Sequence, residues 1–566
     1  MLGRENPQQS LFGASLAVEH LLAPNSFYAV LYRDADRLLR DEDFADCYDT
    51  TTGRPSVPPA RMAKLLLLQT YENLADRAAL ERMTFDLRWK AILGMDVGEG
   101  PIGQATLVEF RARLQLHGQL RAVFDRFLTL ALEAGLIQRE TVQVIDSTAI
   151  WGRGAVEDTY NLIGSALRKL LGATARHRGT TPALVASELA LVLSTPADGR
   201  SLKGRAAIDW DRPEERRAFL TRVVEEARVL LRATATEQAA DAAVAEAAML
   251  LRRILVQDGE GVPPASSPPS DGPPTPPTER DPADVPAVLQ PGAAVQLRDG
   301  VARDRVVSVG DPEMRVGHKS VHQSWAGYKV HVSVETAAEF ITGLTVSVPA
   351  AYDGEAVVPM LRAQQAVGLT PAAYIGDRAY SKAEVRAAVG ALGSEIVARV
   401  PPAGGTPGYF SKDAFTIDLM AKQATCPAGV VTRDFRVRRQ QPAFVFPAAV
   451  CTACPLRARC TPQSSEAMRE WQRGRQVRVH PLEAVLQTGR AVAASPRGQA
   501  LLALRPMIER RLALLMRRGL RQARDVGQAK VEFQGVATAL VTNLRRLGTL
   551  FALSPPSRAS WAATTA

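Results

Sequence analysis

Three carboxylate side chains of this sequence lie where they could bind divalent cations together. Asp146 ends a short β-branched segment (residues 141–146), and Asp377 ends a second one (residues 372–377). Glu509 comes later, in a segment with helical periodicity. Mg²⁺ and Mn²⁺ prefer oxygen ligands and keep coordination positions open for water and phosphate. Two such ions about 4 Å apart can activate a water or a 3′-hydroxyl for phosphoryl transfer. Taken singly, each carboxylate is more typical of a turn, a cap or a surface ion pair.

The order of the predicted elements is the reason to consider these carboxylates together. Strand, strand, strand, helix, strand, helix, strand and helix are expected at residues 141–146, 327–335, 339–348, 354–367, 372–377, 381–390, 395–399 and 498–518. This order matches an RNase H-like fold of the α/β (α+β) class, a mixed sheet with flanking helices. Its two central parallel strands are neighbours and end at the same edge. Asp146 and Asp377 should therefore reach one metal site, which Glu509 could complete from its helix.

The remaining segments differ in composition. Residues 263–291 contain 11 of the 37 prolines, which no packed helix or strand tolerates. We expect a helical N-terminal domain (1–138), a first catalytic strand (139–154), a helical insertion with a proline-rich linker (155–300), the catalytic core (301–400), a Cys/Arg-rich insert (401–497), C-terminal helices (498–550) and a disordered tail (551–566).

Four of the five cysteines are close in sequence. Cys426 is followed by Cys451, Cys454 and Cys460, while Cys47 lies far away. Four thiolates that include a Cys-x2-Cys pair are sufficient for a tetrahedral zinc site. The second Cys-x2-Cys pair of a common zinc ribbon is missing, so partly buried free thiols are the alternative. Structural zinc would fold a segment that offers little apolar core of its own.

The net charge of +10 is concentrated in one segment. Residues 430–524 contain 19 arginines, no lysine and five acidic residues, a local charge of +14. The planar guanidinium suits phosphate oxygens, which favours contact with nucleic acid. A solvated surface in a protein from a GC-rich genome is the alternative. Trp471, among these arginines, could stack on an unpaired base or form the small core of the insert.

Other polar residues near the predicted strands have structural interpretations. Asp353 is expected to cap a helix, with a place beside the metal site as the alternative. Asp311 and Glu313 are expected to pair with Arg315 in a turn. His331 should lie beside the site without being an obvious metal ligand.

Several segments together resemble the DDE transposases of bacterial insertion sequences, in the branch with a helical N-terminal domain and a cysteine-containing insert. The segments that carry the resemblance are Leu65–Tyr71, Phe110–Arg113, Val144–Thr148, Asp311–Arg315, Gly327–Lys329, Gly376–Tyr380, Ile508–Arg510, Ala529–Gln534 and Asn543–Arg546. The resemblance implies that Asp146, Asp377 and Glu509 bind two divalent metal ions, Mg²⁺ or Mn²⁺, as the catalytic triad. It also implies that Arg505 contacts a DNA phosphate near the cleaved end.

The match to this family has a gap near the glutamate. The family often has a tyrosine three residues before the arginine and a lysine seven residues after the glutamate. Here these positions hold Leu502 and Met516, with Arg517 adjacent. This departure concerns the contacts to the DNA end and not the three carboxylates of the metal site. Further DNA contacts are expected from Arg510, Arg517, Lys530 and Trp471.

These features predict a transposase that cleaves DNA at the ends of its element and transfers the strand into target DNA. Its partners would be the terminal inverted repeats, the target DNA and further copies of the chain, as a homodimer or a higher oligomer. An inactive zinc-containing DNA-binding protein derived from a transposase, or a related metal-dependent nuclease, are the alternatives. No apolar run is long enough to span a membrane, and no secretory signal is evident. We expect a cytoplasmic, nucleoid-associated bacterial protein.

Overall fold

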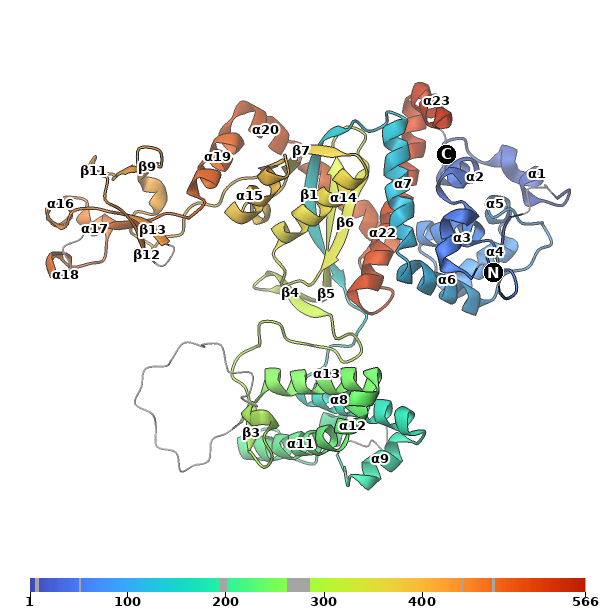
Figure 1. Cartoon of the computed structure of the whole chain (residues 1–566), viewed down its shortest axis with the longest axis horizontal. Helices are drawn as coiled ribbons and strands as arrows, with labels where there is room; N and C mark the ends of the chain where they lie inside the picture. The colour runs from blue at the N-terminus through green and yellow to red at the C-terminus, as the bar shows by residue number, and fades with distance from the viewer. Residues whose placement is uncertain are drawn as a thin grey trace.

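The computed structural model describes residues 1–5, 10–49, 52–193, 201–261, 286–438, 441–470 and 474–564. Trp471 and most of the proline-rich linker lie outside these ranges. Figure 1 shows a central sheet with helices around it, a separate group of helices below, and a small β-rich unit extending to one side. Among the described helices, none has the length and apolar character needed to cross a membrane.

The central sheet is mixed, as predicted from the order of the elements. Its strands run in the order β6-β5-β1-β7-β8, and β4 pairs with the first part of β5. Their bounds are β1 (Glu140–Trp151), β4 (Arg315–Ser320), β5 (Gln323–Glu335), β6 (Ile341–Ser347), β7 (Thr370–Ile375) and β8 (Glu395–Val397). β5 is antiparallel to β1, β4 and β6, whereas β7 is parallel to both β1 and β8. The prediction that the strands bearing Asp146 and Asp377 are parallel neighbours is confirmed.

The first strand extends beyond the β-branched segment that predicted it. That segment ends at Asp146, but β1 continues to Trp151, within the range 139–154 assigned to it, because β5 remains paired with it as far as Gly327. On the other side, the pairing with β7 ends at Val144 opposite Ile375. Asp146 therefore lies on a part of β1 that is paired with β5 but no longer with β7. From this point the edge of β1 on the side of β7 and Asp377 is unpaired.

Helices follow the strands in the predicted places. They are α14 (Val357–Ala366), α15 (Ala383–Ala391), α19 (Glu483–Ala494), α20 (Pro496–Leu502), α21 (Pro506–Leu515) and α22 (Gln528–Leu553). The single helix expected over 498–518 is two helices followed by a π-helical turn, Met516–Leu520. Pro506 begins α21, a position that suits proline because the first-turn N–H groups have no partner within the helix. This break places Glu509 in the first turn of α21.

The N-terminal helices share one hydrophobic core with the sheet. They are α1 (Ala14–Val18), α2 (Phe27–Leu38), α3 (Pro59–Glu72), α4 (Asp76–Phe85), α5 (Leu87–Ile92), α6 (Gln104–Leu116) and α7 (Gln119–Glu133). The core is continuous from Phe27 through the strands to Trp561. α22 joins the two parts, since it packs on α2, α3 and α7 and also on β6. The side chain of Asn543 bonds both backbone polar groups of Ile341, at 2.8 Å each.

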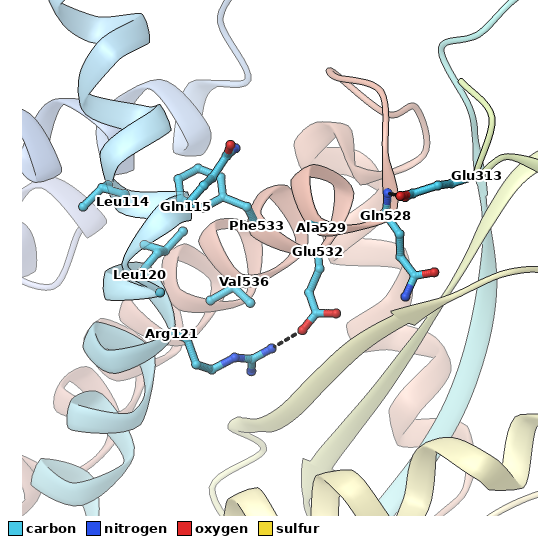
Figure 2. A pocket seen from close by; sticks show the side chains of 11 residues that line it. Leu114, Gln115, Leu120, Arg121, Glu313, Gln528, Ala529, Glu532, Phe533 and Val536 are labelled. Carbon is cyan, nitrogen blue, oxygen red and sulfur yellow. Dashed lines mark hydrogen bonds and ion pairs between the residues drawn. The ribbon is translucent and has the colours of Figure 1, made fainter. Parts of the chain in front are cut away.

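A charged pair spans the same junction, beside a cavity of about 580 Å³ (Figure 2). Arg121 of α7 donates to Glu532 of α22 at 2.8 Å and to the Leu344 carbonyl of β6 at 2.7 Å. The other Glu532 oxygen accepts from the Val346 N–H at 3.3 Å. The N-terminal helices are therefore held against the sheet by polar contacts as well as by apolar packing.

The helical insertion between β1 and β4 has its own core, separate from the main one. It contains α8 (Thr159–Arg178), α9 (Pro182–Glu188), α10 (Leu202–Arg205), α11 (Pro213–Ala233), α12 (Ala235–Ala240), α13 (Ala242–Asp258), β2 (Gly259–Gly261) and β3 (Val295–Leu297). In Figure 1 these helices form the group below the sheet. The insertion adds length between Asp146 and Asp377 without separating their strands.

The cysteine-containing insert between β8 and α19 is built from short elements. They are β9 (Thr416–Asp418), β10 (Gln423–Thr425), β11 (Val431–Thr432), β12 (Phe435–Arg438), β13 (Gln441–Val445), β14 (Gln476–Arg478), α16 (Ala448–Thr452), α17 (Arg457–Cys460) and α18 (Ser465–Glu470). The strands form two three-stranded sheets over a small apolar core. In Figure 1 this unit extends away from the central sheet beyond α19.

The predicted disordered tail is wrong for residues 555–563, which form α23 (Pro555–Ala563). Trp561 is 1% exposed and packs against Phe127 and Phe551. Its indole N–H donates to Asp34 at 3.1 Å. Two consecutive prolines suggested an irregular chain, but proline is favoured at the start of a helix. Burial of one large aromatic side chain then anchors this segment to the core.

Candidate active site

Asp377 and Glu509 line one pocket beyond the end of β7. Asp377 follows that strand by two residues, and its side chain accepts the Ala379 N–H at 2.8 Å. Glu509 is exposed and reaches the same pocket from the first turn of α21. The cavity has a volume of about 470 Å³ and is also lined by Arg378, Arg399 and Arg505. Two carboxylates from distant parts of the chain therefore face one basic cavity.

Asp146 is connected to this pocket through Arg505. The closest atoms are Arg505 Nη2 and Asp146 Oδ2, 3.7 Å apart, and the Asp146 side chain is only 16% exposed. The Ser147 N–H donates to Asp146 at 2.8 Å. The pKa of Asp146 is raised to about 6, mainly by burial and also by the negative charges of Asp377 and Asp353, while the Ser147 N–H and Arg505 act to lower it. A carboxylate that is costly to ionise in the free protein is a good site for a cation.

The oxygen donors suit a hard divalent cation, but the side chains are not gathered into a closed site. Within the described ranges, no group of three or more His, Cys, Asp or Glu side chains is close enough to hold a metal ion. Arg505 provides the positive charge next to Asp146. The exposed Glu509 side chain lines the pocket and forms no ion pair with the described part of the chain.

Asp353 is not the helix cap that the sequence predicted. Tyr352 holds the cap position of the 3-10 turn Asp353–Ala356, and no side chain caps it. Asp353 instead forms an ion pair with Lys329 of β5 and accepts the Ser147 hydroxyl at 3.0 Å. It thus lies beside Asp146, as the alternative interpretation had it. Lys329 is a site neighbour that the sequence reasoning did not single out, although it belongs to the matched segment Gly327–Lys329.

His331 lies in β5, 1% exposed, and its Nε2 is 2.8 Å from the Ser347 hydroxyl. Burial lowers the pKa of His331 to about 4, so the ring is neutral at pH 7. His331 therefore contributes no charge to the site.

The predicted turn around Arg315 has different partners. Arg315 pairs with Asp304 at 2.6 Å and not with Asp311 or Glu313. Asp311 is fully buried and accepts the Tyr328 hydroxyl at 2.5 Å, while Glu313 accepts the Gln528 N–H. The ion pair predicted from sequence proximity is wrong, because the chain folds Asp311 and Glu313 toward the start of α22.

The four neighbouring cysteines line one small cavity of about 30 Å³, and Cys47 is buried elsewhere. Burial raises the pKa of the Cys451 and Cys460 thiols, and the nearby sulfur atoms raise it further. The Cys451 sulfur accepts the Arg475 N–H at 3.4 Å. The raised pKa makes ionisation of these thiols unfavourable. A bound cation would stabilise the thiolates and lower the pKa again. The set fits zinc in its chemistry, although the described sulfur atoms do not form a closed metal cluster.

Two family models match parts of this chain. A transposase domain (DUF772) matches residues 17–113, and a transposase DDE domain matches residues 425–548. Together the two matches support a DDE transposase of the insertion-sequence type. The DDE match contains Glu509 and all four neighbouring cysteines, whereas Asp146 and Asp377 lie outside both matched ranges. No curated protein and no solved structure matches the transposase. DDE domains generally use divalent metal ions, and transposases bind DNA and typically oligomerise.

The predicted DNA-contact residues Arg510, Arg517 and Lys530 are exposed, whereas other arginines of the 430–524 segment form internal contacts. Arg510 lies 3.9 Å from Glu339. Arg518 instead donates to the Tyr71 carbonyl and stacks on its ring, 4.4 Å from the centroid, and Arg524 donates to the Leu74 carbonyl. Part of the arginine-rich segment therefore joins the π-helical turn to the N-terminal helices. Trp471 lies outside the described residues.

The raised pKa of Asp146 predicts a gain in stability when its charge is removed. In the unfolded chain this carboxyl ionises near its usual pKa of 3.8, and in the folded chain near 6. Above pH 6 it is ionised in both states, and its burial then opposes folding; below pH 3.8 it is neutral in both. Asp146→Asn should raise the free energy of unfolding of the metal-free transposase by roughly 1–3 kcal/mol at pH 8. This gain should vanish as the pH falls toward 4.

Urea unfolding in EDTA across this pH range measures the effect. The exposed Asp299→Asn is the matched control, which should change stability by less than about 0.5 kcal/mol. Equal stability of Asp146→Asn and the parent at pH 8 would contradict the prediction.

Proposed function

We propose that this transposase cleaves DNA at the ends of its element and joins the freed 3′-hydroxyl to target DNA at one metal-dependent site. The observation that supports this most is the shared pocket of Asp377 and Glu509 at the end of β7, with Asp146 next to it through Arg505. Both reactions are phosphoryl transfers, so one set of carboxylates can serve both.

Asp146, Asp377 and Glu509 would hold two Mg²⁺ or Mn²⁺ ions. When bound, such ions activate the attacking hydroxyl or water and stabilise the leaving oxygen. Arg505 is placed to hold a phosphate next to the bond that breaks, because its side chain lines the pocket and is 37% exposed. The Ser147 hydroxyl and the Lys329 ammonium both donate to Asp353 and hold this carboxylate beside the site.

The proposed catalytic domain is RNase H-like. The mixed order β6-β5-β1-β7-β8 supports this assignment, because it places β1 and β7 side by side at its centre. We assign residues 139–154, 301–400 and 498–550 to that domain. The helices of residues 1–138 are proposed to bind the element ends, with exposed basic residues of the C-terminal segment contacting the DNA backbone.

The cysteine-containing insert is proposed to bind one structural zinc ion. Cys426 follows β10, Cys451 lies in α16, Cys454 follows that helix and Cys460 ends α17, and all four line one cavity, which supports this assignment. Zinc would hold these elements together where the apolar core is small. The insert would then present its arginines to DNA.

A single experiment separates the proposed reaction from its alternatives. The transposase is incubated with Mg²⁺ and DNA that carries the inverted repeats flanking its gene, together with a supercoiled target plasmid. We expect strand-transfer products whose ends map to the repeats. Cleavage without transfer would identify a nuclease, and binding without cleavage an inactive DNA-binding protein. The synaptic complex should contain at least two copies of the chain, because two ends must be brought together.

A further inference from the structure

A second cavity continues from the pocket of the carboxylates. It has a volume of about 700 Å³, and Arg378, Arg399 and Leu502 line both cavities. The second cavity adds Arg490 from α19. None of the residues that line it is acidic. A path lined by positive charge therefore leads away from the proposed metal site.

The fold brings Arg378 and Arg399 together at the edge of the sheet. β7 and β8 are parallel, with Ile375 opposite Val397, and the Gly376 N–H donates to the Val397 carbonyl at 3.2 Å. Both arginines follow directly after these paired strand ends, so they emerge at the same edge. Arg378 is also the residue next to Asp377. The register of β7 and β8 thus determines the distance of these arginines from the metal site.

Arg378 and Arg399 are exposed, and neither forms an ion pair with any described residue. Other arginines of this region are already neutralised. Arg490 pairs with Glu483 at 3.1 Å, and Arg497 pairs with Glu395. Two unpaired guanidinium groups beside one pocket are unfavourable for each other, and an anionic ligand would compensate for this repulsion.

We propose that this arginine groove, which runs from Arg378 and Arg399 toward Arg490, binds the DNA strand that continues from the bond being cut, with the unpaired Arg378 and Arg399 holding two successive phosphates. This proposal rests on the proposed function and names the path of its substrate. Ala493, Ala494 and Ala503 also line this cavity, and their small side chains leave room for a nucleic-acid backbone. Contacts of this kind bind any sequence, because they reach phosphates and not base edges. The groove fixes the direction in which the strand leaves the carboxylates.

The test compares Arg378→Gln/Arg399→Gln with the full-length parent. Binding to a 30-base-pair duplex of arbitrary sequence is measured in EDTA between about 50 and 300 mM KCl, a range over which phosphate contacts are strongly salt-dependent. Each lost phosphate contact lowers the slope of log K against log salt by about 0.9, so the double variant should lose about 1.8. Its affinity at 100 mM salt should fall roughly 10- to 100-fold. Arg378→Lys/Arg399→Lys keeps the charge and should restore most of the slope.

The matched control is Arg216→Gln/Arg217→Gln in α11 of the helical insertion, which removes two exposed arginines elsewhere. Its slope should equal that of the parent. Equal melting temperatures of the parent and the variants establish that folding is intact. If the parent binds and cleaves DNA and the double glutamine variant keeps the parent slope, the groove proposal is overturned and the proposed function stands. If the parent shows no salt-dependent DNA binding, the proposed function itself fails.

Discussion

Replacing Asp377 with asparagine should abolish DNA cleavage by this transposase while leaving DNA binding intact. Asparagine keeps the shape of the side chain but removes the charge that a divalent cation needs. Loss of several kcal/mol of transition-state stabilisation lowers the rate about 10³-fold or more. Asp146→Asn and Glu509→Gln should have the same effect. Removing a negative charge from a pocket that holds DNA weakens repulsion, so the affinity for DNA should stay equal or rise slightly.

Cleavage of DNA with flanking inverted repeats in Mg²⁺, and binding of the same DNA in EDTA, measure the two effects separately. Glu384→Gln is the matched control, because this exposed carboxylate of α15 lies outside the pocket and pairs with His480. It should cleave DNA at the parent rate. Full cleavage by any one of the three variants removes that residue from the proposed triad, and loss of DNA binding would show that the carboxylate has a structural role.

The relation between Asp146 and Asp377 could be predicted because it depends on strand order. Two β-branched segments that each lead to a carboxylate, in an order typical of a mixed sheet, become parallel neighbours in the structure. The end of β1 could not be predicted, since it depends on how far β5 remains paired on the other side. The periodicity of apolar residues is a property of one segment, whereas the length of a strand depends on how far the neighbouring strand remains paired with it.

Side-chain partners were the harder part to predict. Asp353 has the sequence context of a cap, but the ion pair with Lys329 depends on β5 lying beside β1. The ion pair expected between Arg315 and its sequence neighbours failed for the same reason, because Asp304 lies closer in space. Arg378 and Arg399 lie together without ion-pair partners because of the register of β7 with β8, and this register cannot be predicted from amino-acid composition. Tertiary contacts decide which charges are neutralised.

The C-terminal helix α23 shows that the burial of an apolar residue is equally difficult to predict from the sequence. Trp561 is the kind of residue that could anchor a segment, but its burial requires Phe127 and Phe551 to lie together. Those two residues are far apart in sequence and meet only because α22 packs on α7. A terminal segment with prolines and alanines therefore suggests disorder until the surface that receives its tryptophan is known.

Replacing Cys454 with serine should release zinc from the transposase and unfold its insert. The parent should contain about one zinc ion per chain, and Cys454→Ser should contain close to none, because a structural site needs its full set of four ligands. The apolar core around Phe415, Phe444 and Phe446 is small. Zinc binding to such sites contributes about 10–16 kcal/mol of apparent free energy, more than this core can replace. Residues 401–482 should then become sensitive to protease, while the continuous core of the N-terminal helices and the sheet remains resistant.

Elemental analysis and limited proteolysis measure both effects on the same preparation. Cys47→Ala is the matched control, because Cys47 is buried in the N-terminal part and does not line the cysteine cavity. It should keep its zinc and its resistant insert. A parent without zinc, or a Cys454→Ser variant whose insert stays resistant, would show that the four thiols are held by packing alone. The DNA affinity of Cys454→Ser adds a further consequence: if the folded insert presents its arginines to DNA, the slope of binding against salt should fall together with the zinc.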